Sequence, residues 1–93
     1  MNNYHEIVSI LNSIDVKVII YLHFTGGATA RKMMRDALGS QEGLNRALRD
    51  LAIHRIVRAD MEHGKRDKPF CLTERGKVIA ELLVEADSRI SKL

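Results

Sequence analysis

The sequence contains little of several residue types that mark particular classes of protein. One cysteine, one proline and no tryptophan occur in 93 residues. The lone Cys71 cannot form an internal disulfide, and the four histidines (His5, His23, His54 and His63) are too scattered to match any zinc-ligand spacing. We therefore expect no disulfide-stabilised secreted domain, no metal site and no cofactor.

The chain also lacks features of membrane proteins, exported proteins and enzymes. No apolar run approaches the roughly 18–20 residues of a membrane span, and residues 1–6 do not resemble a signal peptide. No nucleophile–base signature, phosphate loop or paired-acid motif can be placed in one cleft. The sequence thus predicts a cytoplasmic protein, from a cell without a nucleus or its virus, with no membrane partner and no enzymatic activity.

A formal net charge of +3, from 15 Lys and Arg against 12 Asp and Glu, permits a nucleic-acid partner without requiring one. Apolar spacing predicts mostly helices, and a change to two-residue alternation predicts one hairpin. The second helix is apolar on several sides, so we expect it to be central. The expected helices are 3–14, 14–24, 30–38, 41–54 and 74–91, and the expected strands are 56–61 and 69–72.

Turn and cap residues organise these elements into a motif. Thr29, Ser40 and Thr73 stand where helix N-caps are expected, and Gly39 suits a tight turn between helices 30–38 and 41–54. Two helices joined in this way form a helix-turn-helix, and a charged hairpin directly after them is typical of a wing. We predict an α+β, mainly α, single domain over 1–93. Its parts are an N-terminal dimerisation helix (1–13), a winged helix-turn-helix core with a two-stranded wing (14–73) and a C-terminal dimerisation helix (74–93).

Four short segments occur in a characteristic order along the chain. They are Gly27-Ala28-Thr29-Ala30-Arg31, Leu38-Gly39-Ser40-Gln41-Glu42-Gly43-Leu44, Leu48-Arg49-Asp50-Leu51 and Leu72-Thr73-Glu74-Arg75-Gly76. In this order they resemble the MarR/ArsR-like winged-helix transcription regulators, broadly including archaeal and archaeal-virus relatives, and the resemblance covers roughly Ser13 to Leu83. One departure lies at Arg55, where the family usually has glycine: either Arg55 takes a left-handed conformation at a cost of about 1 kcal/mol, or the helix ends differently.

The resemblance implies that helix 41–54 enters the DNA major groove and that the wing, 62–68, contacts phosphate or the minor groove. Arg pairs well with guanine, and Asn or Gln with adenine. Gly43, early in the helix, would allow a close approach to the DNA backbone. The expected base contacts are Gln41, Asn45, Arg46 and Arg49; the expected phosphate contacts are Thr29, Arg31, Lys32 and Ser40; the wing contacts are Lys65, Arg66 and Lys68. The plainer interpretation of each set is a solvated face, a helix cap or an ordinary charged turn.

The terminal helices carry more apolar surface than one small domain can cover. Residues of the last helix repeat at alternating steps of four and three, as in a heptad seam. The predicted interface of a homodimer comprises Ile7, Leu11, Ile79, Leu83, Ala86 and Ile90; alternatively, these helices pack only on each other. A dimer would present two recognition helices to half-sites about 34 Å apart, so the expected target is a pseudo-palindrome.

Two other functions remain open at this point. One is a winged-helix module that binds protein, which the acidic Glu42, Asp50, Asp60 and Glu62 keep in consideration. An exposed apolar patch on the recognition helix would favour that function, whereas a polar face favours DNA. The other is an architectural DNA binder that tolerates many sequences.

Overall fold

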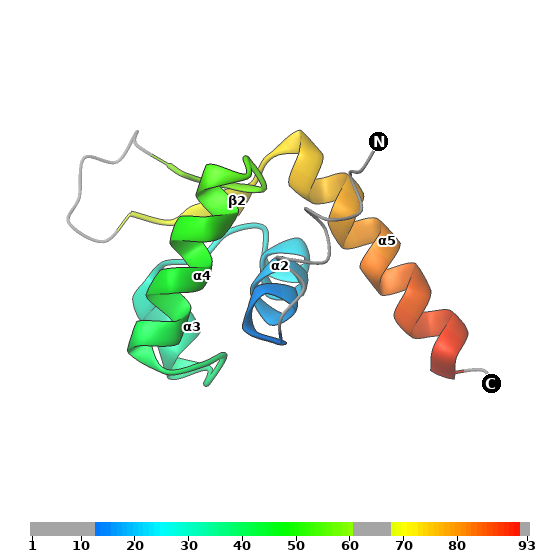
Figure 1. Cartoon of the computed structure of the whole chain (residues 1–93), viewed down its shortest axis with the longest axis horizontal. Helices are drawn as coiled ribbons and strands as arrows, with labels where there is room; N and C mark the ends of the chain where they lie inside the picture. Colours follow the sequence, from blue (N-terminus) through cyan, green and yellow to red (C-terminus); the bar gives the residue numbers. More distant parts are fainter. Residues whose placement is uncertain (1–12, 61–67, 92–93) are drawn as a thin grey trace.

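The computed structural model describes residues 13–60 and 68–91 of the chain. Helix α2 lies between helices α3 and α4 on one side and helix α5 on the other (Figure 1). The predicted N-terminal helix, with Ile7 and Leu11, and the wing residues Lys65 and Arg66 lie outside the described residues. The elements are α2 (Ser13–Thr25), α3 (Ala30–Arg35), α4 (Gln41–Ile53), β1 (Val57–Ala59), β2 (Phe70–Leu72) and α5 (Glu74–Ser91).

The core forms where the apolar stripes of these helices meet. Spacings of three and four residues place the apolar side chains of α4 on one face of the helix, and that face is buried against α2. Full burial of each large aliphatic side chain contributes about 1.5–3 kcal/mol. The large apolar side chains that solvent barely reaches are Val18, Ile19, Leu22, Met33, Leu44, Leu51, Ile56 and Val57.

The predicted hairpin is present, with shorter strands than expected. Strands β1 and β2 are antiparallel, and Val57 pairs with Leu72 while Ala59 pairs with Phe70. The sequence did not indicate a further pairing, in which Ala28 exchanges two backbone hydrogen bonds with Phe70, at 3.0 and 2.8 Å. The segment before α3 is therefore tied to the base of the hairpin.

Helix α4 ends in a Schellman motif centred on Arg55. This residue adopts the left-handed conformation, with φ of 61°. Its N–H donates to the Ala52 carbonyl at 3.0 Å, and the Ile56 N–H donates to the Leu51 carbonyl at 2.8 Å. The motif normally uses glycine at this position because a side chain there is strained. The first of the two alternatives for Arg55 is thus correct.

Helix α3 ends in the same motif, where the prediction was wrong. The left-handed residue is Ala37, with φ of 58°, and not Gly39. The Ala37 and Leu38 N–H groups donate to the Met34 and Met33 carbonyls at 3.0 and 3.2 Å. The helix therefore stops at Arg35, three residues earlier than predicted, because a local hydrogen-bond motif overrides the apolar periodicity that continues to Leu38.

The start of α5 is fastened to the end of α4 through Thr73. Its N–H donates to the Ile56 carbonyl at 3.0 Å, and its hydroxyl donates to the Arg55 carbonyl at 2.5 Å. The same hydroxyl oxygen accepts from the Gly76 N–H at 3.0 Å, which makes Thr73 the predicted N-cap. A Cβ atom on Gly76 would lie 2.1 Å from the Ile56 carbonyl oxygen, so only glycine permits this approach.

Two helices differ from the expected burial. Helix α2 is central but not enclosed, since Phe24 is 71% exposed on the side away from the core. In α5, Ile79 and Leu83 pack against this chain's own core, whereas Val78, Leu82 and Ile90 are exposed. Packing within the chain therefore involves two residues of the predicted dimer interface, Ile79 and Leu83. The apolar side chains that stay exposed lie on a neighbouring face of α5.

We predict that Arg55→Gly increases the free energy of unfolding by about 1 kcal/mol, because glycine removes the left-handed strain. Urea denaturation of the purified variants measures this change. Arg58→Gly, in ordinary strand conformation, serves as the control and should lower stability. An unchanged or lower unfolding free energy for Arg55→Gly would show that the left-handed conformation of Arg55 does not cost stability.

Gly76→Ala should destabilise the fold by about 3 kcal/mol, since the new methyl group meets rigid backbone. Gly26→Ala provides the comparison: its φ is 81° but nothing lies within 4 Å of a Cβ, so its cost is limited to conformational strain of about 1 kcal/mol. Thermal melts followed by circular dichroism would rank the two. Equal melting temperatures for the two variants would contradict this prediction, and would show that the backbone at Ile56 moves to make room for the methyl group.

Candidate nucleic-acid interface

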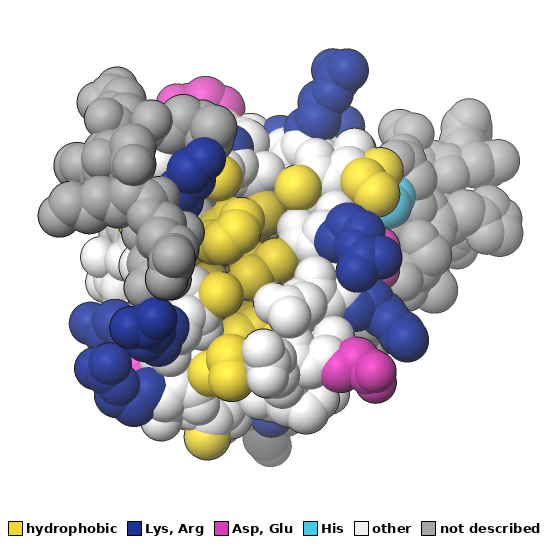
Figure 2. All heavy atoms as spheres, turned by 90° about the vertical axis from the view of Figure 1, so that its left-hand side faces the viewer, with side chains coloured by type: hydrophobic (Ala, Val, Ile, Leu, Met, Phe, Trp, Pro, Cys, Tyr) yellow, Lys and Arg dark blue, Asp and Glu magenta, His cyan; other side chains and the backbone are white. Residues whose placement is uncertain are grey.

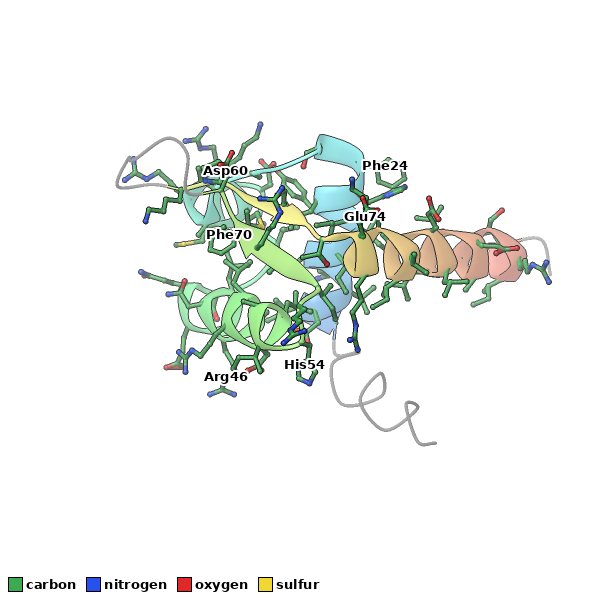
Figure 3. All side chains as sticks on the ribbon, turned by 90° about the horizontal axis from the view of Figure 1, so that it is seen from above. Phe24, Arg46, His54, Asp60, Phe70 and Glu74 are labelled. Carbon is green, nitrogen blue, oxygen red and sulfur yellow. The ribbon has the colours of Figure 1, made fainter. Side chains whose placement is uncertain are left out.

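The two faces of α4 differ sharply in chemistry. Leu44, Leu48 and Leu51 are buried against the core. The four residues predicted to read bases are all exposed, and Arg46 points away from the body of the protein (Figure 3). Their amide and guanidinium groups are therefore available to a partner. These four residues are Gln41, Asn45, Arg46 and Arg49.

Hydroxyl groups cap both helices of the motif, as predicted. The Thr29 Oγ1 atom accepts from the Lys32 N–H at 3.1 Å, and the Ser40 Oγ atom accepts from the Gly43 N–H at 3.0 Å. Helix N-termini attract anions. In α4, however, Glu42 already places a carboxylate in the first turn. The phosphate contacts of Thr29 and Ser40 stay predictions beside this capping role.

Gly43 was predicted to allow a close approach to the DNA backbone, but the structure shows that it is needed for helix packing. A Cβ atom at this position would lie 2.8 Å from Cδ1 of Ile14 and 3.1 Å from the Ser40 hydroxyl oxygen. Glycine here lets α4 pack closely on α2, because the position of the missing side chain faces Ile14 and not the exposed face of α4. Sequence alone could not reveal this, because the neighbouring helix decides which side of α4 is crowded.

Helix α3 adds positive charge to the same part of the molecule. Arg31, Lys32 and Arg35 are exposed. Beside them, the Tyr21 hydroxyl donates to the Asp36 carboxylate at 2.7 Å, and this bond raises the pKa of the Tyr21 phenol above its ordinary value. This hydrogen bond links α2 to the residue that ends α3.

The face that holds α3, α4 and the hairpin is mixed in character. Figure 2 shows Lys and Arg side chains on both sides of a strip of hydrophobic side chains. The basic flanks agree with the predicted DNA-facing surface. The apolar strip was not expected, because the spacing of apolar residues does not show which of them stay uncovered once the elements pack together.

The described end of the wing is closed by backbone contacts. The Asp60 N–H donates to the Pro69 carbonyl at 2.8 Å, and Lys68 is half-buried. Of the predicted wing contacts, only Lys68 can be placed, because Lys65 and Arg66 lie outside the described residues. Arg58, exposed in the middle of β1, is a further cation near the wing that the sequence analysis did not single out.

Cys71 lies half-buried at a cavity of about 330 Å³ between the end of α2, the hairpin and the start of α5. His23, Arg58 and Lys77 line the same cavity. Within residues 13–60 and 68–91, no three His, Cys, Asp or Glu side chains are grouped closely enough to hold a metal ion. No helix in these ranges is long and apolar enough to cross a membrane.

Comparison with known proteins addresses the fold. No protein-family model matches the chain, and no curated protein matches it. Two structures of Lactococcus lactis ZitR, both of a C30AH42A mutant, are similar, with TM-scores of 0.77 and 0.76 at 18% identity. The chain has the winged helix-turn-helix fold. The first match covers 85% of this chain and 54% of ZitR, and the second, described as the apo form, covers 96% and 68%. The winged helix of this chain thus spans about half of the first ZitR chain that it matches.

Two substitutions separate the capping role of Ser40 from its predicted phosphate contact. Ser40→Ala should lower the unfolding free energy by about 1 kcal/mol, whereas Ser40→Gly should lower it by only a few tenths. Chemical denaturation gives both values. Weaker DNA binding by the stable Ser40→Gly variant would indicate that the hydroxyl contacts phosphate, and unchanged binding would leave it a cap only.

Proposed function

We propose that this protein binds double-stranded DNA as a homodimeric transcription regulator, with α4 in the major groove and the wing on phosphate or the minor groove. We also propose the cytoplasm of a cell without a nucleus as its location. An archaeal or archaeal-virus origin stays a prediction, and so does the absence of enzymatic activity.

The observation that carries the proposal is the division of α4 into two faces. One face is anchored in the core, and the other exposes two amides and two guanidinium groups within nine residues. These groups match the hydrogen-bonding edges of adenine and guanine in the major groove, where each good bidentate contact contributes about 1–3 kcal/mol of discrimination.

The fold supports the same function. The winged helix-turn-helix fold, which this chain shares with Lactococcus lactis ZitR at a TM-score of 0.77, places one helix of the motif where it can enter a major groove. The exposed cations of α3 lie on the helix that precedes α4, where they can neutralise phosphates and position α4 over the bases. Fold alone does not assign a function, so the chemistry of the exposed α4 face decides between regulators and other winged-helix proteins.

A dimer follows from the exposed apolar row of α5. The C-terminal half of this helix extends away from α3, α4 and the hairpin (Figure 1), and Leu82 and Ile90 are 61% and 68% exposed. Exposed apolar surface of this kind is typical of a protein–protein contact. Two copies would present two α4 helices to a pseudo-palindromic site with half-sites about 34 Å apart.

A protein-binding module is the second candidate, and the apolar strip in Figure 2 favours it. An architectural DNA binder is the third, and it predicts equal affinity for all sequences. These three functions differ in the dependence of DNA affinity on salt and on DNA sequence, so a salt titration followed by site selection separates them.

The test is a fluorescence-anisotropy titration of random duplex DNA from low to physiological salt, followed by selection of a preferred site. We expect binding with a steep negative salt slope. Absence of binding even at low salt would overturn the proposal in favour of the protein-binding module. Equal affinity for the selected and random duplexes would favour the architectural binder.

Single substitutions in α4 should then act on specificity. Asn45→Ala and Arg46→Ala should each weaken binding to the selected site by about 1–3 kcal/mol and affect random DNA much less. The double substitution Lys65→Ala and Arg66→Ala should weaken binding to both duplexes alike and reduce the salt slope by about 2. Arg89→Ala, exposed on α5, is the control and should change neither.

A further inference from the structure

Exposed large apolar side chains gather on two helices that lie outside the proposed DNA-binding surface. Four of them belong to α2 and α5: Phe24 at 71% exposure, Val78 at 56%, Leu82 at 61% and Ile90 at 68%. An isolated exposed leucine needs no explanation, but two continuous apolar faces on one small protein do.

The first face is a shallow groove on α2, which we call the α2 groove. Val16, Ile20 and Phe24 follow one another at four-residue steps along it, and Tyr21 and Leu38 form its other wall. Its volume is about 390 Å³, and Lys17 lies among its lining residues. The groove runs along the side of α2 opposite the buried Val18, Ile19 and Leu22, and Figure 3 shows Phe24 near the end of the helix.

The second face, the α5 row, consists of Val78, Leu82, Ala86 and Ile90, again at four-residue steps. All four side chains are exposed. The α5 row cannot cover the α2 groove of its own chain. Ile79 and Leu83 hold α5 against the core, and the core lies on the other side of α2. A straight helix fixed on one side of α2 does not reach the opposite side.

The two faces match each other in pattern and in charge. Rows of side chains at four-residue steps on two helices interdigitate at a crossing angle of about −50°, which is the commonest helix packing in globular proteins. Lys17 lines the α2 groove. The edge of the α5 row carries two exposed carboxylates, Glu81 and Glu85, and one guanidinium, Arg89, which pairs with Glu85 at 3.2 Å. An apolar helix face with a net negative edge is therefore a partner that the α2 groove fits, and this chain contains one.

We propose that the α5 row of a second copy of this chain lies in the α2 groove, and that each copy fills the groove of the other around a two-fold axis. The proposal rests on the homodimer of the proposed function and names its contact surface. A two-fold axis makes the contact occur twice, so that both exposed faces of each copy are buried.

Cysteine cross-linking between differently tagged copies tests the contact. In a Cys71→Ser background, one copy carries Phe24→Cys and the other carries Leu82→Cys or Ile90→Cys. After the copies are mixed and mildly oxidised, we expect a disulfide-linked heterodimer on a non-reducing gel. Ile53→Cys, at a position of α4 that is 68% exposed, replaces the α5 cysteine in the control and should give no product with Phe24→Cys.

The other outcomes are distinct. A dimer in light scattering whose α5 cysteines link only to each other would overturn the α2 groove contact and leave the homodimer standing. A dimer in light scattering that forms no disulfide at all would also overturn the α2 groove contact. The groove would then be covered by residues 1–12 or by another protein. A monomer at micromolar concentration would overturn both the contact and the homodimer.

Charged substitutions give an independent measurement. Phe24→Asp and Ile90→Asp should each weaken the dimer at least about tenfold, as expected for an apolar residue central to an interface. Ile53→Asp should leave the dimerisation constant unchanged. Sedimentation equilibrium gives the constants, and circular dichroism verifies that each variant is folded. An unchanged constant for Phe24→Asp would remove α2 from the interface.

Discussion

The arrangement of this fold depends on a few atoms where the end of α4 meets the start of α5. Thr73 holds the carbonyls of Arg55 and Ile56, caps α5 with the same hydroxyl, and brings Gly76 against the Ile56 backbone. Because β1 begins one residue after Ile56, this joint fixes three elements at once: α4, the hairpin and α5. If any one of these elements moved, the hydrogen bonds that connect it to the others at Thr73 would break.

The joint also explains why Arg55 is tolerated in a strained conformation. The left-handed residue lets the Ile56 N–H return to the Leu51 carbonyl and turns the chain directly into β1. A non-glycine residue persists in such a conformation when the surrounding contacts determine it more strongly than the local strain opposes it. Here those contacts come from Thr73, 18 residues further along the chain.

The sequence was sufficient for the elements whose boundaries depend on local signals. The cap residues Ser40 and Thr73 and the apolar spacing of α4 located their helices to within a residue. The errors have two sources: a left-handed residue that is not glycine, which the sequence pattern does not mark, and a contact between residues distant in the chain. Leu38 continues the period of α3, yet a Schellman motif at Ala37 ends the helix; the close neighbour of Gly43 is Ile14, 29 positions earlier. In the candidate site, exposure of Gln41, Asn45, Arg46 and Arg49 followed from helical period alone. The position of Arg58, the Ala28–Phe70 bridge and the apolar strip all required the assembled fold.

The Ala28–Phe70 bridge has a mechanical consequence. It joins the segment that leads into α3 to Phe70, the first residue of β2. Thr73, directly after the last residue of β2, bonds to the carbonyls of Arg55 and Ile56 at the end of α4. Strand β2 is thus held at both of its ends, by the segment before α3 and by the end of α4. Because backbone hydrogen bonds fix both ends of β2, this strand cannot slide along α3 or α4 unless those bonds break. The base of the hairpin therefore moves with the two helices as one rigid unit.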